Sequence, residues 1–344
     1  MLVILSPYTG QRMNDHILER LLFRRAAHTG LRFLSRLCGL ALPALCPSLV
    51  AMTVVVGPAD ADYIVDGSND HVELQQAIDT VAAAGGGKVI LRQGIYNCGA
   101  EIVIPHDGRV RIVGEKMAKG MEGGVILRAT ATLTNLVSTA GSGNPATNAD
   151  LSHDIHFEHI TFNGNGRVTN VVSLTNADFV SFTFCRVIGG VNGIVTVWDS
   201  SQDPTAATVP GGLFITNSIL SASTGIALDL QYQTQCWISN VWFSGPGTTS
   251  TWINFRSSNK IHIANCEFNT ATQALRFQDT GTRGCHDITI TGCTFSVGSG
   301  NKCWTEQRTH GASKRVLVSG CINTDSAPAD TLAGGSVPLA SVGF

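Results

Sequence analysis

Acidic and basic side chains recur at equivalent places in a repeated part of this chain, and their chemistry suits sugars. In a pair of carboxylates, one can protonate the leaving oxygen of a glycosidic bond while the other activates water or attacks. Arginines bind anionic sugars through two parallel hydrogen bonds, and one could instead act in β-elimination. A tryptophan could stack on a sugar ring. The candidates are Asp229, Asp199 and Glu306 for catalysis, and Arg256, Arg276, Trp304 and Arg308 for substrate binding.

A simpler interpretation of the same residues stays open. Polar side chains on the outer surface keep any repetitive β protein soluble, and opposite charges on neighbouring strands pair with each other. The position of Asp199 also depends on the strand register, because Trp198 could equally face outward.

A repeat in the second half of the chain indicates how these residues are positioned. The phrase apolar-x-apolar-x-(Asn, Gly or His)-small-x-apolar is clearest in Ile155–Phe162, Ile261–Phe268 and Ile288–Phe295. Its copies begin at residues 155, 180, 213, 236, 261, 288 and 316, at intervals of 23 to 33 residues. Such a period is typical of a solenoid, and the alternation of Val, Ile, Thr and Phe predicts strands.

A second strand is expected after each phrase, as in Gly225–Leu230. If Leu228 and Leu230 face inward, Asp229 faces outward. The same register places the following pairs on the outer surface: Val197 with Asp199, Asn254 with Arg256, Arg276 with Gln278, and Trp304 with Glu306 and Arg308.

Four cysteines share one position of the repeat. The aligned small residues are Ile160, Cys185, Ser218, Val241, Cys266, Cys293 and Cys321. Parallel side chains about 4.8 Å apart on adjacent coils suit a disulfide badly. They are therefore predicted to be free and buried. The chain has no C-x-x-C spacing, which would suggest a zinc site.

Three histidines occur at intervals of three residues, in His153-x-x-His156-x-x-His159. Side chains with this spacing converge on a helix but not on a strand, so this segment is predicted to be a solvated strand edge.

The ends of the chain differ from its body. Residues 1–51 carry six arginines and a net charge of +4, whereas the remainder carries −6. Residues 1–51 are interpreted either as a signal-like leader or as an extension before a true start at Met52. Two prolines in their apolar run argue against a membrane span. The predicted β domain covers residues 52–325, and residues 326–344 form a tail. An acidic body without a basic stripe argues against nucleic acid as a partner.

The opening of the body carries a family resemblance. The segments are Ala61–Asp70, Val72–Asp79, Gly85–Leu91, Gly94–Tyr96 and Ile102–Pro105. They resemble the start of pectate-lyase-superfamily proteins, which implies a right-handed parallel β-helix. Asp70 and Glu73 are expected to cap a helix at about 71–84, whose apolar face of Val72, Ala77, Ile78 and Val81 would cover the open end of the solenoid.

The resemblance implies polysaccharide activity but names no reaction. The Asp-Asp, Gly-His-Gly and Arg-Ile-Lys signatures of polygalacturonases are missing, as is the Trp-Ile-Asp-His of pectate lyases. Three hypotheses follow: a hydrolase or lyase acting on an extended, acidic polysaccharide, a non-catalytic glycan-binding adhesin or tail-spike body, and a purely structural virion or surface protein. The resemblance also implies a secreted or virion-associated location and allows a homotrimer. No cofactor is expected, except calcium if the protein is a lyase.

Overall fold

The computed structural model describes residues 51–106, 108–116, 123–141, 151–197, 211–246, 249–278, 284–298, 301–307 and 314–324. Ala51–Phe344 forms one compact unit. The predicted leader, apart from Ala51, and the predicted tail lie outside the described residues, so both remain predictions.

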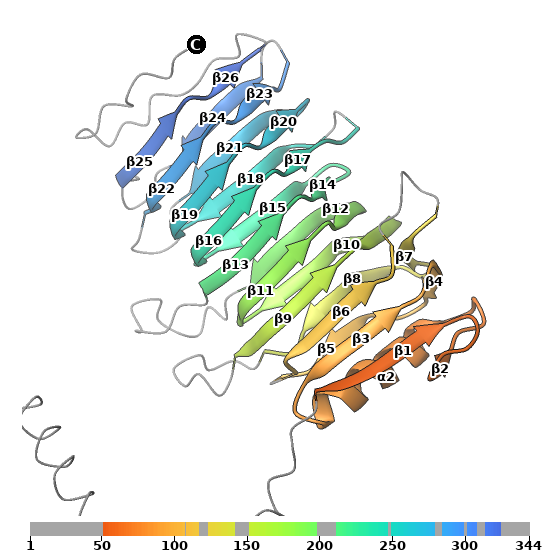
Figure 1. Ribbon diagram of the computed structural model, residues 1–344. Coiled ribbons are helices and arrows are strands. Elements are labelled where there is room, and N and C mark those ends of the chain that lie inside the picture. Colours follow the sequence, from red (N-terminus) through yellow and green to blue (C-terminus); the bar gives the residue numbers. More distant parts are fainter. Residues whose placement is uncertain are drawn as a thin grey trace, which may run out of the picture. The chain divides into compact units, whose positions relative to one another are not determined.

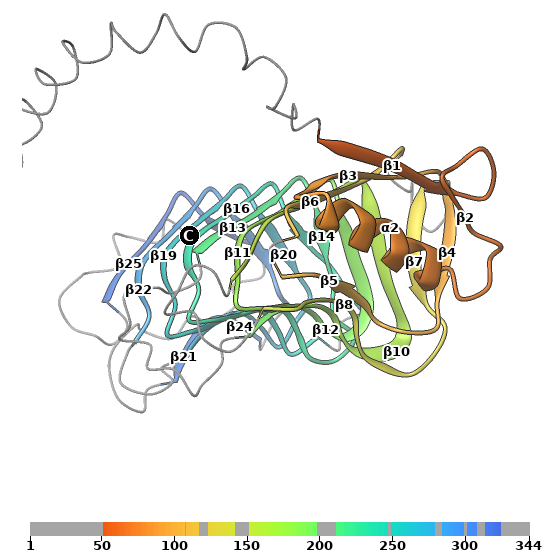
Figure 2. The same ribbon diagram turned by 90° about the horizontal axis from the view of Figure 1, so that it is seen from below.

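Parallel strands wrap around one elongated core in three faces (Figures 1 and 2). Face 1 is one continuous sheet in the order β2-β1-β3-β6-β9-β11-β13-β16-β19-β22-β25. Its strands are β1 (Met52–Gly57), β2 (Tyr63–Ile64), β3 (Gly87–Leu91), β6 (Val110–Gly114), β9 (Ser152–Glu158), β11 (Ala177–Thr183), β13 (Gly211–Thr216), β16 (Thr234–Ser239), β19 (Asn259–Ala264), β22 (His286–Thr291) and β25 (Lys314–Ser319).

Faces 2 and 3 belong to a second sheet, because two long strands, β10 (Ile160–Thr175) and β12 (Arg186–Val197), cross from one face to the other. Face 2 also contains β4 (Gly94–Cys98), β7 (Val125–Ala129), β14 (Ile219–Leu220), β17 (Trp242–Phe243), β20 (Glu267–Asn269), β23 (Thr294–Ser296) and β26 (Ile322–Asn323). Face 3 also contains β5 (Ile102–Ile104), β8 (Leu133–Thr139), β15 (Ile226–Gln231), β18 (Thr251–Arg256), β21 (Gln273–Gln278) and β24 (Lys302–Gln307).

The repeat found in the sequence sets the register of face 1. The seven predicted starts form one unbroken column of paired residues: Ile155, Val180, Leu213, Cys236, Ile261, Ile288 and Val316. The predicted all-β, parallel β-helix solenoid is therefore confirmed.

The Asn, Gly or His of the phrase makes the bend from face 1 to face 2. Asn217, Asn240 and Asn265 have φ of 50°, 53° and 53°, and Gly292 has φ of 61°. Asparagine and glycine tolerate this left-handed conformation better than other residues. The backbone thus favours Asn or Gly at this position, although Phe184 takes the same conformation with φ of 52°.

The core is filled by columns in which similar side chains from successive coils stack on one another. The rings of Phe243, Phe268 and Phe295 stack with centroids 4.7 and 5.0 Å apart, which matches the strand spacing. All eight cysteines of the described residues are buried and none is in a disulfide bond, as predicted. Burial raises the pKa of the Cys185 thiol to about 12, so this cysteine behaves as a small apolar residue.

Helix α2 (His71–Ala83) confirms the predicted N-terminal helix and packs against β1, β3 and β5 at one end of the core (Figure 2). Its buried face contains Leu74, Ala77, Ile78 and Val81. The prediction that Val72 belongs to this face is wrong, because 43% of that residue is exposed.

The predicted cap at Asp70 is also wrong. Asp70 has helical backbone angles and its side chain makes no capping hydrogen bond. The buried carboxylate instead accepts hydrogen bonds from the backbone N–H of Gly67 at 2.8 Å and of Asn97 at 2.6 Å. Asp70 thereby connects the start of the helix to strand β4 rather than satisfying the helix terminus.

Candidate functional site

The candidate residues gather on face 3, where neighbouring coils place equivalent side chains side by side. Val195, Asp229, Asn254, Arg276 and Thr305 form one column of paired positions. These positions alternate with those of core side chains such as Leu228 and Leu230, so the column lies on the outer side of the strands.

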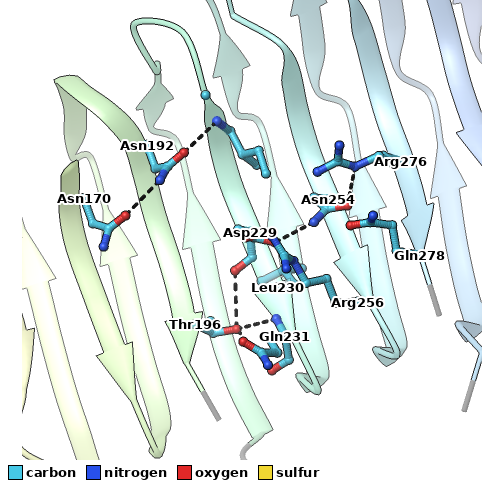
Figure 3. Close-up of polar contacts among 12 residues, drawn as sticks. Asn170, Asn192, Thr196, Asp229, Leu230, Gln231, Asn254, Arg256, Arg276 and Gln278 are labelled. Atoms are coloured by element: carbon cyan, nitrogen blue, oxygen red, sulfur yellow. Dashed lines mark hydrogen bonds and ion pairs between the residues drawn. The ribbon is translucent and has the colours of Figure 1, made fainter. Parts of the chain in front are cut away.

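Hydrogen bonds from β12 hold β15 in place (Figure 3). The Asn192 side chain accepts a hydrogen bond from the backbone N–H of Ile226 at 3.0 Å and donates one to Asn170 at 3.0 Å. Further along, the Thr196 hydroxyl accepts a hydrogen bond from the N–H of Gln231 at 2.7 Å. Both ends of the Asp229 strand are therefore fixed to the preceding coil.

The carboxylate of Asp229 is buried and fully engaged (Figure 3). Its Oδ1 accepts hydrogen bonds from Asn254 Nδ2 at 2.7 Å and Arg256 Nε at 2.9 Å. Its Oδ2 accepts a hydrogen bond from Arg256 Nη2 at 2.8 Å. This two-point pairing is among the stronger interactions that a carboxylate makes. Asp229 thus orients Arg256.

Arg276 lies next to this pair without a carboxylate of its own. Its Nε donates a hydrogen bond to Asn254 Oδ1 at 2.8 Å. Within the described part of the chain, neither of its two terminal nitrogens has a hydrogen-bond partner. Burial lowers the pKa of the Arg276 guanidinium, and the nearby charge of Arg256 lowers it further, while Asp229 opposes the shift. Two guanidiniums therefore share one carboxylate, and one positive charge remains.

Gln278 follows Arg276 on the same side of β21. Its Nε2 donates a hydrogen bond to Gln307 Oε1 at 2.5 Å, whereas its buried Oε1 has no partner. The sequence placed Gln278 in the outward stack but gave it no role. Only the three-dimensional arrangement shows an acceptor without a donor beside Arg276.

Trp304 was predicted to face outward, and this prediction is wrong. It pairs with the core residue Leu275 and is 1% exposed. Its ring packs edge-on against Phe295, with centroids 6.1 Å apart. Thr305, not Trp304, continues the outer column after Arg276. Trp304 therefore belongs to the core, and a role in stacking on a sugar is not supported.

Glu306 also lies in a different register from the one expected. It pairs with Phe277, a core position, and is partly buried. On β12, the residue opposite Asp229 is Val195. Asp199 and Arg308 are outside the described residues.

The three histidines of the sequence motif lie along β9 and just beyond it. His156 bonds to Ser181, and His159 stacks on Phe184 with centroids 5.2 Å apart. In the described ranges, no group of three or more His, Cys, Asp or Glu side chains could hold a metal ion. No described helix is long and apolar enough to cross a membrane.

Comparisons with known proteins find similarity in structure alone. No family model matches the chain, and no curated protein matches it. The N-terminal fragment of bacteriophage Phi29 gene product 12 is similar with a TM-score of 0.55 and 11% identity, over 74% of this chain and 50% of the fragment. The alginate lyase from Paenibacillus sp. str. FPU-7 has a TM-score of 0.50 and 12% identity, over 80% and 97%.

A phage tailspike is similar as well. Tailspike protein 2 from Escherichia coli O157:H7 bacteriophage CAB120 has a TM-score of 0.52 and 10% identity, over 80% of this chain and 39% of the tailspike. The chain thus spans half the length of the Phi29 fragment and about two-fifths of the tailspike. At these identities the similarity shows the fold alone, and the predicted parallel β-helix is confirmed.

Proposed function

We propose that this protein binds an extended, anionic polysaccharide along the outer side of face 3, with Arg276 contacting an acidic group of the sugar. The unmatched charge of Arg276 carries the proposal. A partly buried charge is costly unless it is paired, and a sugar carboxylate would supply the missing partner. The planar guanidinium can bind such a group through two hydrogen bonds.

Gln278 supports the same position for the ligand. A buried acceptor without a donor costs about 1–3 kcal/mol, and its Oε1 has no partner. Rotation of the partly buried Gln278 side chain would bring this oxygen to the surface, where a sugar hydroxyl close to the acidic group would donate the missing hydrogen bond. Arg276 and Gln278 then recognise two neighbouring groups of one sugar residue.

The structural neighbours support a carbohydrate-active protein of this fold, since one is named an alginate lyase and another a tailspike. A secreted or virion-associated location and a homotrimer follow only by analogy with these neighbours. Both are proposals for this chain.

The second candidate function is binding of the polysaccharide without any cleavage. Both oxygens of Asp229 are already engaged, and Val195 rather than a carboxylate lies opposite it. These two observations favour an adhesin or tail-spike body over a hydrolase. Catalysis by Asp229, Asp199 and Glu306 stays a prediction, as does calcium in a lyase.

The test uses the full chain and a panel of acidic and neutral polysaccharides. Retention on each glycan is measured together with new reducing ends and unsaturated-uronate absorbance. We expect retention of an acidic glycan that Arg276→Gln weakens at least tenfold. Arg167→Gln is the control, because Arg167 is an exposed arginine of β10.

The outcomes separate the candidates. Retention without cleavage supports an adhesin. Reducing ends alone indicate a hydrolase, and a gain in absorbance indicates a lyase. If no acidic glycan is retained, the proposal is wrong and a structural protein remains. If both variants bind like the wild type, the proposal is also wrong, because the glycan then binds without Arg276.

A further inference from the structure

Ser181 and His156 form a hydrogen-bonded pair on the outer side of face 1, away from the residues assigned above. The two residues are partners in the register of β9 and β11. His156 Nδ1 lies 2.7 Å from Ser181 Oγ. A serine in contact with an imidazole is the arrangement by which a base activates a hydroxyl nucleophile.

The pair opens into a shallow pocket of about 270 Å³. The pocket is lined by Arg111, His156, Phe157, Glu158, Ser181 and Thr183. Its volume is below the range of about 300–1,000 Å³ that is typical of sites for drug-sized ligands. It therefore suits a small group, such as the substituent of a sugar, better than a whole oligosaccharide.

The protonation state of His156 suits a base. Burial lowers the pKa of the His156 imidazole, Arg111 lowers it further, and Asp154 opposes the shift. The imidazole is therefore neutral at pH 7, and its tautomer with the proton on Nε2 leaves Nδ1 able to accept the proton of Ser181.

Arg111 supplies a positive charge on the other side of the pair. It is the register partner of His156 on the preceding coil. Its Nη2 donates a hydrogen bond to Glu158 Oε2 at 2.5 Å. This ion pair fixes the guanidinium in the pocket, and its remaining N–H groups can stabilise a developing oxyanion.

We propose that Ser181, His156 and Arg111 hydrolyse a small carboxylic ester, such as an O-acetyl group on a saccharide. Ser181 Oγ bonds to the acyl carbon while its proton passes to His156 Nδ1, and the carbonyl oxygen becomes an oxyanion facing Arg111. Collapse breaks the bond to the sugar oxygen, which takes the proton from His156. Water then attacks the acyl-serine in the same way, which releases the carboxylic acid and restores Ser181.

Other outward hydroxyls of face 1 provide an internal comparison. Thr183, Thr216, Ser239, Thr291 and Ser319 follow one column of paired positions. The hydroxyl of Thr183 bonds to that of Thr216 at 3.3 Å. Among the described hydroxyls of this column, none bonds to a histidine. Ser181 is thus distinguished from them by its base.

The first test is covalent labelling of the full chain with a fluorophosphonate, followed by peptide mapping. We expect one adduct, on Ser181. His156→Gln keeps a hydrogen-bonding side chain without a base and should slow labelling about 100-fold, the lower end of the usual contribution of a general base. Ser239→Ala should label like the wild type.

Hydrolysis of 4-nitrophenyl acetate by the same variants is the second test. Ser181→Ala should lose the activity. The activity of the wild type should rise with pH through a midpoint below 6.5, the ordinary pKa of histidine. The charged and titratable groups around His156 that influence this midpoint are Arg111, Asp154, Glu158 and His159. If Ser181 is not labelled, or if His156→Gln labels at the wild-type rate, the pair is only a surface hydrogen bond and the proposal is wrong.

Discussion

Replacing Asp229 by Asn should destabilise the protein strongly, because Asp229 is the buried partner that holds Arg256. The change removes the charge that Arg256 pairs with through two hydrogen bonds. Removing one partner of a buried ion pair costs about 3–5 kcal/mol. The side chain of Asp229 is 10% exposed, but that of Arg256 is 34% exposed. Solvent thus screens part of the loss, and we expect about 3 kcal/mol.

Thermal unfolding followed by circular dichroism measures this change. A domain of this size shifts its Tm by about 2–4 °C per kcal/mol, so Asp229→Asn should lower the Tm by about 6–12 °C. The matched control is Asp287→Asn, which breaks an exposed ion pair with Arg315 on face 1. Exposed pairs contribute little to stability, so the control should melt close to the wild type.

A double variant distinguishes anchoring from catalysis. Asp229→Leu with Arg256→Met replaces the pair by apolar side chains and should recover much of the lost stability. If Asp229→Asn instead melts like the wild type while polysaccharide cleavage disappears, the carboxylate is catalytic. In that case the inference that Asp229 is an anchor would be refuted.

Two further substitutions and one chemical modification test the fold. Asp70→Ala should cost about 2–3 kcal/mol in the free energy of unfolding, measured by urea titration, because two backbone N–H groups lose the buried carboxylate that accepts their hydrogen bonds. Asn265→Val should lower the Tm whereas Asn265→Gly should not, because φ is 53°. Titration of the native protein with a thiol reagent should leave the eight described cysteines unmodified until it unfolds, since all are buried; reaction in the native state would contradict their placement in the core.

The fold was predictable because the repeat encodes it locally. Alternation places Ile261, Ile263 and Phe268 inside, and the Asn or Gly before the small residue of most copies indicates the left-handed bend. Each coil repeats the same pattern, so a strand register that is ambiguous in one copy is fixed by the other copies. The free state of the cysteine column followed from the same geometry.

The candidate site was less predictable, because face 3 has no phrase to fix its register. The spacing from Asn254 to Arg276 is 22 residues, but Thr305 comes 29 residues after Arg276. The variable length of the intervening segment hid the position of β24. Alternation within that strand was correct in period and wrong in phase, which exchanged the core residue Trp304 for the outer residue Thr305.

The register also bears on the kind of cleavage that this surface could support. Hydrolysis needs two carboxylates placed on either side of the glycosidic bond. In the described part of the column, Asp229 has Val195 on one side and Asn254 on the other, followed by Arg276 and Thr305. Elimination from a uronate needs instead a cation that stabilises charge on the sugar carboxylate and a base. Arg276 could provide the first. If the protein cleaves its ligand at face 3, we therefore expect an unsaturated product, and Arg276→Gln should abolish it, while reducing ends without absorbance would place the reaction elsewhere.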